Sequence, residues 1–206
     1  MADGTLKVGT ITTSSGSGTI TLGQSGETVN VSGTAGTGFG KLLQVVSVTK
    51  ADTYSESIAA NTMSSTNITG LTASITLAST SNKILITGSI ATGRDSNDGN
   101  SGVGIAMFRG GSLVGVGDAA SNRTRVTSMS HHAADLNITT VPINFLDSPG
   151  STSEQTYTFR FLNSDGSTSN ITLNKSASDS DAAYAGRAIS TITLMEIAGW
   201  LVYLKQ

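Results

Sequence analysis

The stretch Tyr157-Thr158-Phe159-Arg160-Phe161 alternates aromatic and polar side chains residue by residue. Successive side chains of a β-strand point to opposite faces, so this period of two is typical of a strand with one buried face. The stretch therefore predicts a strand whose aromatic side chains enter a core, while Thr158 and Arg160 face the other way.

The same alternation recurs along the chain on both sides of this stretch. Polar segments rich in Gly, Asn, Asp and Ser separate the apolar runs, as turns separate strands. Gly110-Gly111 predicts a two-residue hairpin. About eight to ten strands at this spacing predict an all-β, jelly-roll-like β-sandwich over residues 41–198. The apolar positions are Leu42 to Val48; Leu71, Ala73, Ile75 and Leu77; Ile84, Ile86 and Ile90; Val103, Ile105 and Met107; Leu113, Val114 and Val116; Val141, Ile143 and Phe145; and Ile189 to Ile197. Ala182 to Ala188 is the one helical candidate, and it is short.

Residues 1–40 have a different pattern, with very short apolar fragments between glycines, and the glycine cluster Gly33–Gly40 ends them. Their apolar residues are too few to form a core within one chain. We expect several copies of the chain to share these side chains around one axis, which makes the segment an extended Gly/Ser/Thr-rich β arm or shaft. A flexible linker is the alternative. The residues expected to pack between chains are Ile11, Ile20, Leu22, Val29 and Val31.

Composition argues against several classes of protein. There is no Cys, so disulfide frameworks and thiolate metal sites are excluded. Charged residues make up 13% of the chain and the net charge is −2, so there is no basic surplus to neutralise nucleic-acid phosphates. No apolar run is long enough to cross a bilayer and no signal peptide is visible. We expect neither a nucleic-acid nor a membrane partner.

Catalysis is not expected either. Ser130, His131 and Asp135 contain the letters of a catalytic triad, but triads are recognised by geometry, and no nucleophile elbow surrounds Ser130. Glu154 and Glu196 could supply the carboxylate pair of a glycosidase, but no aromatic sugar platform accompanies them. The glycines near residues 102–117 lack the Lys and helix of a phosphate loop, so no cofactor is predicted.

Metal binding is also not predicted, although two loops have a suitable composition. The segment 95–100 is rich in Asp and Asn, but its spacing differs from an EF-hand loop. Asp179 and Asp181 form a second acidic loop, and a Ca²⁺ between chains remains the alternative to solvated turns. His131 and His132 are adjacent, so on a strand they would point to opposite faces. We expect a polar strand or loop near the surface there, with a His site requiring three-fold symmetric copies.

The order of several short segments resembles small fibre proteins of tailed phages that infect marine bacteria and cyanobacteria. At the N-terminus these segments are Gly4–Ile11, Ser15–Gly23 and Gly26–Val29. The later ones are Lys41–Val46, Ser81–Ile86, Gly117–Arg125, Phe145–Pro149 and Ile192–Ile197. The resemblance implies a virion component assembled in the host cytoplasm. It also implies an N-terminal arm that fixes the fibre to the particle and a β tip domain that forms a homotrimer.

The end of the chain departs from that pattern. Residues 199–206 contain an apolar run that would be a liability if it were exposed on a monomer. We expect this segment to be a docking tail that packs between chains or against another virion protein. The residues concerned are Trp200, Leu201, Val202 and Tyr203.

The expected function is therefore that of a non-enzymatic tail fibre or short appendage that contributes to host attachment. A capsid decoration or head-fibre protein is the alternative, and a free carbohydrate-binding protein is less favoured. The partners would be copies of the chain, other phage virion proteins and a host receptor. Polar loops are the candidates for facing that receptor, at Arg94, Asp95, Asn97, Asp98, Asn122, Arg123, Asn163 and Asp165.

Overall fold

The computed structural model describes residues 42–95 and 101–199. Contacts divide the chain into two units, Met1–Gly40 and Lys41–Gln206, and the described residues belong to the second. Within the described residues the structure is all β, and the helical candidate Ala182–Ala188 forms turns instead. The predicted arm, Asn97, Asp98 and the apolar tail at residues 200–203 lie outside the described residues.

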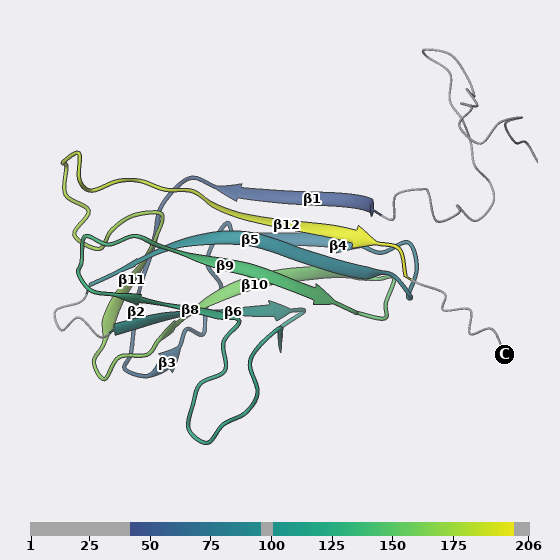
Figure 1. Cartoon of the computed structure of the whole chain (residues 1–206), viewed down its shortest axis with the longest axis horizontal. Helices are drawn as coiled ribbons and strands as arrows, with labels where there is room; N and C mark the ends of the chain where they lie inside the picture. Colours follow the sequence, from purple (N-terminus) through teal and green to yellow (C-terminus); the bar gives the residue numbers. More distant parts are fainter. Residues whose placement is uncertain (1–41, 96–100, 200–206) are drawn as a thin grey trace, which may run out of the picture. The chain divides into compact units, whose positions relative to one another are not determined.

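Antiparallel strands form two sheets in the described part of the chain (Figure 1). Sheet A contains β1 (Leu42–Lys50), β2 (Tyr54–Ile58), β5 (Lys83–Arg94), β9 (Thr139–Asp147), β11 (Ser169–Leu173) and β12 (Ser190–Ile197). Sheet B contains β3 (Thr62–Met63), β4 (Thr72–Thr76), β6 (Ser101–Arg109), β7 (Ser112–Val114), β8 (Ser128–His132) and β10 (Glu154–Asn163).

The order of the main strands is that of a jelly roll. Sheet A runs β1-β12-β5-β9. Beyond the start of β12, β11 pairs with the same side of β5, and β2 pairs with β11. Sheet B runs β4-β10-β6-β8. Apart from the step from β6 to β8, each of these main strands is joined to the next one in the chain by a connection that crosses between the sheets, as in two packed Greek keys. The predicted jelly-roll-like sandwich is confirmed.

The core lies between the two sheets and follows the predicted alternation. Tyr157, Phe159 and Phe161 on β10 are all fully buried. They meet the inward side chains of sheet A, which include Ile86 on β5 and Ile192 on β12. Burying a side chain of this size stabilises the fold by about 1.5–3 kcal/mol, so the aromatic row and its partners hold the sheets together.

Several strands of the structure have no clear apolar alternation in the sequence. Ser128–His132 forms β8 and Ser169–Leu173 forms β11, although the first has polar residues on both faces. Each is placed by pairing with a longer strand, β8 with β6 and β11 with β5, and β2 then pairs with β11. Backbone hydrogen bonds to strongly alternating neighbours thus override weak local patterns.

Pro142 and Gly88 constrain the backbone of sheet A. Pro142 stands in β9, which pairs with β5 at the end of the strand order in the described residues. Proline is confined to such edge positions because it cannot donate to a ladder on both sides.

Gly88 stands in the middle of β5, where a Cβ would overlap the carbonyl oxygen of Thr191 and the Cδ1 of Ile192.

Replacing Gly88 by alanine should destabilise the sandwich by about 1–3 kcal/mol, because β12 would have to move away from β5. Gly166→Ala is the matched control, since a Cβ there meets nothing within 4 Å in the described structure. Urea unfolding followed by far-ultraviolet circular dichroism measures both. Equal midpoints for the two variants would contradict the close approach of β12 to Gly88.

Candidate functional site

A groove of about 570 Å³ lies on the outer side of sheet B. Its floor contains Leu162 of β10 and Met129 of β8, whose strand neighbours Phe161 and Ser130 are buried on the inner side. Since side chains alternate along a strand, Leu162 and Met129 point outward. The residues that line the groove are Asn61, Asn122, Arg123, Thr124, Met129, Leu162, Asn163 and Ser164.

One wall of the groove is the long loop between β7 and β8. The N–H of Gly117 donates to the Val126 oxygen at 3.3 Å, which closes the loop at its base. The Arg125 Nε also donates to the Gly117 oxygen, at 2.6 Å. A turn at the tip, with Ser121 at a φ of 50°, places Asn122 and Arg123 beside the groove.

Arg123 supplies the charge of the groove. Its side chain is exposed, and no ion pair or hydrogen bond engages its guanidinium within the described structure. No carboxylate is among the described lining residues. The groove therefore combines one free cation with amide and hydroxyl groups over an apolar floor.

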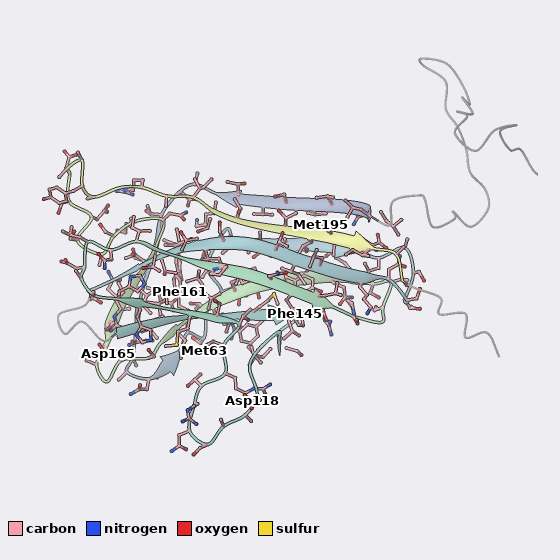
Figure 2. All side chains as sticks on the ribbon, in the orientation of Figure 1. Met63, Asp118, Phe145, Phe161, Asp165 and Met195 are labelled. Carbon is pink, nitrogen blue, oxygen red and sulfur yellow. The ribbon has the colours of Figure 1, made fainter. Side chains whose placement is uncertain are left out.

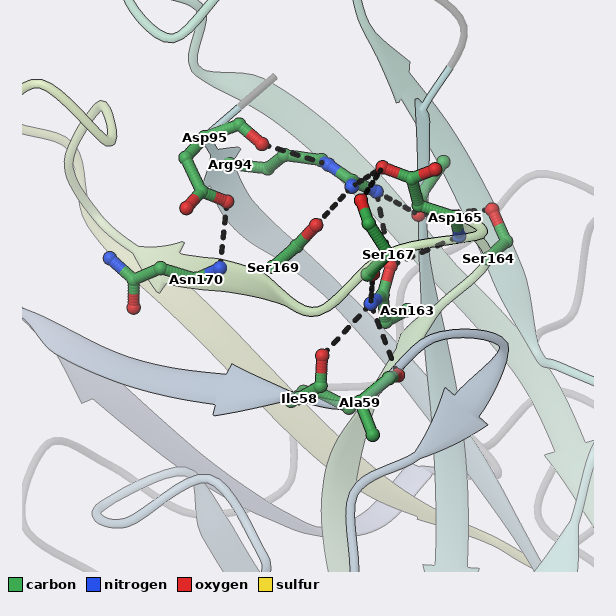
Figure 3. A network of polar contacts seen from close by, with 11 residues as sticks. Ile58, Ala59, Arg94, Asp95, Asn163, Ser164, Asp165, Ser167, Ser169 and Asn170 are labelled. Atoms are coloured by element: carbon green, nitrogen blue, oxygen red, sulfur yellow. Dashed lines mark hydrogen bonds and ion pairs between the residues drawn. The ribbon is translucent and has the colours of Figure 1, made fainter. Parts of the chain in front are cut away.

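The opposite wall, which includes Asn61 and Ser164, is fastened to a buried arginine (Figure 3). The Arg94 side chain is fully buried at the end of β5. Its Nη2 lies 2.5 Å from the Asp165 carboxylate and also donates to the Ser169 hydroxyl. Its Nη1 donates to the Asn163 side-chain oxygen and to the Gly102 carbonyl oxygen, each at 3.2 Å.

Asn163 extends this network into the backbone. Its Nδ2 donates to the carbonyl oxygens of Ile58 at 2.9 Å and Ala59 at 3.1 Å, and to that of Ser167 at 2.9 Å. Its Oδ1 accepts from the Asp165 N–H at 3.0 Å. The Asn163 side chain thus holds the turn between β10 and β11 against the end of β2, and this fixes the groove wall.

The structure separates the predicted receptor-facing residues into three groups. Arg94 and Asn163 are fully buried, so the prediction that they face a receptor is wrong: both satisfy polar groups inside the fold. The second group, Asp165 and Asp95, makes contacts within the fold. Asp165 is half-buried in the ion pair with Arg94. Asp95 is exposed, and its carboxylate accepts the Asn170 N–H at 2.7 Å.

Asn122 and Arg123 make up the third group. They are exposed, and the structure brings them together beside the groove. Met129 and Leu162, which form its floor, are residues that the sequence reasoning missed.

The two histidines lie on opposite faces of β8, as expected for adjacent residues on a strand. His131 is exposed, whereas His132 is fully buried rather than near the surface. The His132 Nε2 lies 3.1 Å from the Ser130 hydroxyl and 3.2 Å from that of Thr92. Burial lowers the pKa of His132, and the nearby charge of Arg94 lowers it further. Ser130 is buried as well, so this pair does not face the surface.

Two of the other carboxylates considered in the sequence, Glu196 and Asp179, have structural partners. Glu196 is buried and accepts hydrogen bonds from the Ala78 N–H at 2.7 Å and the Asn82 amide at 2.6 Å. Asp179 is paired with Lys175 and Arg187. Across the described residues, no group of three or more His, Cys, Asp or Glu side chains could hold a metal ion.

Residues 42–95 and 101–199 contain no helix that is long and apolar enough to cross a membrane.

The outer side of sheet A has a different character. Register places Val45, Met195, Leu85 and Leu146 side by side across β1, β12, β5 and β9. Val45 is 53% exposed and Leu146 is 47% exposed. We call this row and its neighbouring outward residues the uncharged face. The neighbours are Ser47, Thr193, Thr87 and Asn144 in one row, and Thr49, Thr191, Ser89 and Pro142 in the next.

The groove and the uncharged face lie on opposite sides of the sandwich. Figure 2 shows Met195 on β12 at one side and Asp118, in the loop that walls the groove, at the other. The labelled Phe161 lies between them, in the core. A copy that covers the uncharged face would therefore leave the groove open.

No family model matches the chain, and no curated protein does. Solved particles of infectious bursal disease virus are similar in structure. The Gx strain matches with 15% identity and a TM-score of 0.39 over 76% of this chain and 38% of that chain. The T13 particle matches with 14% identity and a TM-score of 0.40 over 76% of this chain and 36% of that one. The match thus spans little more than a third of those chains, and at these values the likeness says nothing about function.

Replacing Arg94 by methionine should lower the free energy of unfolding by about 3 kcal/mol, because Asp165 and Asn163 lose a buried partner. Arg187→Met is the control, since this 56% exposed side chain pairs with Asp179 at the surface and should cost under about 1 kcal/mol. Urea unfolding at pH 7.5 compares the two. Similar losses would show that the Arg94 network does not stabilise this end of the sandwich.

The sandwich should become less stable as the pH falls from 7.5 to 5.5. The folded pKa of His132 lies below the usual value of 6.5, so the unfolded chain takes up a proton that the folded chain resists. The loss should reach up to about 1.4 kcal/mol over this range. His132→Gln should remove this dependence and His131→Gln should retain it, as measured by urea unfolding at each pH. A dependence that survives His132→Gln would assign it to another group.

Proposed function

We propose that this chain is a structural protein of a bacteriophage particle. It assembles as a homotrimer and forms a tail fibre or short appendage that contributes to host attachment. The observation that carries the proposal is the uncharged face, where exposed apolar side chains lie in a row across four strands without charged residues among them. The groove on the opposite side supports the attachment role, because assembly through sheet A leaves it accessible.

A second copy of the same chain suits the uncharged face. Association buries few charges there. Among the described strand residues of this surface, the charged one is Lys83, and it lies at the margin. Depletion of charge at the centre is what distinguishes protein interfaces from other surfaces. Two copies of such a face neither repel one another nor leave ions without water. Exposed Val45 and Leu146 would be removed from water in the same step.

The expectation of three copies comes from the first forty residues of the sequence. Their apolar side chains are too few for one chain, and a shaft shared by three chains would bury them. A trimer also presents three grooves on one rigid body. Three weak contacts with a cell surface then act together through their effective concentration.

A capsid decoration or head-fibre protein is the second candidate. The jelly-roll strand order favours it, since this architecture is frequent in viral capsid domains. In that case the uncharged face would lie against the shell and no receptor would be needed. Imaging of the particle with this chain labelled separates the two candidates by the location and copy number of the label.

The purified protein should have about three times the chain mass of 20.9 kDa in multi-angle light scattering. A double variant, Val45→Lys with Leu146→Lys, should reduce this mass at micromolar concentration, because two charges per chain would enter the interface. Thr76→Lys is the control, since Thr76 is exposed on the outer side of sheet B.

A monodisperse monomer in the unmodified protein would contradict the assembly. If neither the double variant nor Thr76→Lys changed the mass, the interface would not lie on the uncharged face.

A further inference from the structure

We infer that the groove on sheet B binds one carboxylate-bearing sugar unit of a cell-surface glycan. This inference rests on the proposed attachment function and names the class of receptor that it would use. The groove has a volume of about 570 Å³, within the range of roughly 300–1,000 Å³ that small-ligand sites have. That volume holds one sugar ring with its substituents rather than a long chain.

The guanidinium of Arg123 indicates an acidic ligand. Its planar fork matches both oxygens of a carboxylate, and such charge-assisted pairs are roughly twice as strong as neutral hydrogen bonds. The guanidinium has no partner within the described structure, and none of the described lining residues is acidic. A carboxylate would therefore meet the cation without displacing an existing ion pair.

The remaining polar lining suits hydroxyl groups. Asn61, Asn122, Thr124 and Ser164 provide amides and hydroxyls, which can both donate and accept. The Ser164 hydroxyl already donates to the Gly102 oxygen at 3.0 Å, so its own oxygen is left to accept. A sugar hydroxyl can donate to that oxygen.

The floor suits the C–H face of a sugar ring. Leu162 is 3% exposed, and Met129 beside it is 41% exposed. Methionine is unbranched and polarisable, so it adapts to an irregular apolar surface. An apolar floor below a polar rim is the usual arrangement for a ligand that has one apolar face and many polar groups.

One wall of the groove is formed before any ligand arrives. The Arg94 and Asn163 contacts hold the turn that carries Ser164, and the Asn61 N–H donates to the Asp165 oxygen at 2.8 Å. A wall that became ordered only on binding would lose conformational entropy and so reduce the affinity. Here folding has already ordered the wall. The loop with Asn122 and Arg123 then completes the site from the other side.

An acidic peptide is less well matched than an acidic sugar. Several carboxylates in a row would require several cations, and Arg123 is the one charged residue in the described lining. The number of neutral amide and hydroxyl groups exceeds the number of charges, as suits a ligand with one carboxylate and many hydroxyls.

Saturation-transfer NMR on the full chain tests the inference with three probes. These are the methyl glycosides of N-acetylneuraminic acid and galacturonic acid, and neutral methyl galactoside. At least one acidic sugar should bind with a dissociation constant in the millimolar range, typical of a single weak contact, and the neutral sugar should bind at least about tenfold more weakly.

Substitutions assign the binding to the groove. Arg123→Ala should weaken the acidic sugar at least about tenfold, and Arg123→Lys should have an intermediate effect, because it keeps the charge but loses the fork. Arg187→Ala removes a 56% exposed arginine that does not line the groove, and it should leave the affinity unchanged. Since Arg123 is exposed and unpaired in the described structure, none of its variants should alter the circular dichroism spectrum.

Three results would overturn the inference: no binding of either acidic sugar, equal binding of the neutral sugar, or an acidic affinity that Arg123→Ala leaves unchanged. A hexaglutamate peptide that binds more tightly than the sugars would replace the sugar by an acidic protein segment. Light scattering on the same samples tests the proposed trimer independently of sugar binding. A trimer that binds no sugar overturns the ligand class alone, whereas a monomer contradicts the assembly.

Discussion

Contact between the inner faces of the two sheets is the interaction on which the rest of the structure depends. The aromatic row of β10 packs against the aliphatic side chains of β5 and β12, and both sheets are held in place by that contact. Because side chains alternate along every strand, an inward row determines which residues face outward. The groove floor at Leu162 and the exposed row at Val45 therefore follow from the same burial that makes the core.

At one end of the sandwich a polar network takes the place of this apolar contact. Burying a guanidinium is costly unless its charge and its N–H groups are matched. Arg94 meets that requirement with Asp165, Asn163 and Ser169, together with two backbone oxygens. Here the ends of β5 and β10 meet the starts of β6 and β11, so the Arg94 side chain ties four segments together, and Asn163 adds the end of β2. Because hydrogen bonds are directional, they fix the position of the groove wall more closely than apolar packing would.

The sequence predicted the strands with strong alternation and the class of fold, because a period of two follows directly from strand geometry. It did not predict β8 or β11, whose positions come from pairing with distant strands. Arg94 and Asn163 stand beside turns rich in Asp, Asn and Gly, so they resembled exposed loop residues, and their burial depends on partners up to 105 positions away. Asn122 and Arg123 were predicted as surface residues and are exposed. Their meeting with Met129 and Leu162 could not be predicted, since it depends on how a long loop folds back across sheet B.

Pro142 opposes the addition of further copies at the β9 edge of sheet A. A proline has no N–H, and strands accept one at an edge, where the nitrogen can face away from the partner strand. A foreign strand that approached this edge would find a gap in the row of donors and could not continue the ladder past it. Open-ended growth by strand addition, which leads to fibrils, is thereby discouraged on that side. Contacts through the flat surface of the sheet remain, and rotational symmetry can close these after a fixed number of subunits.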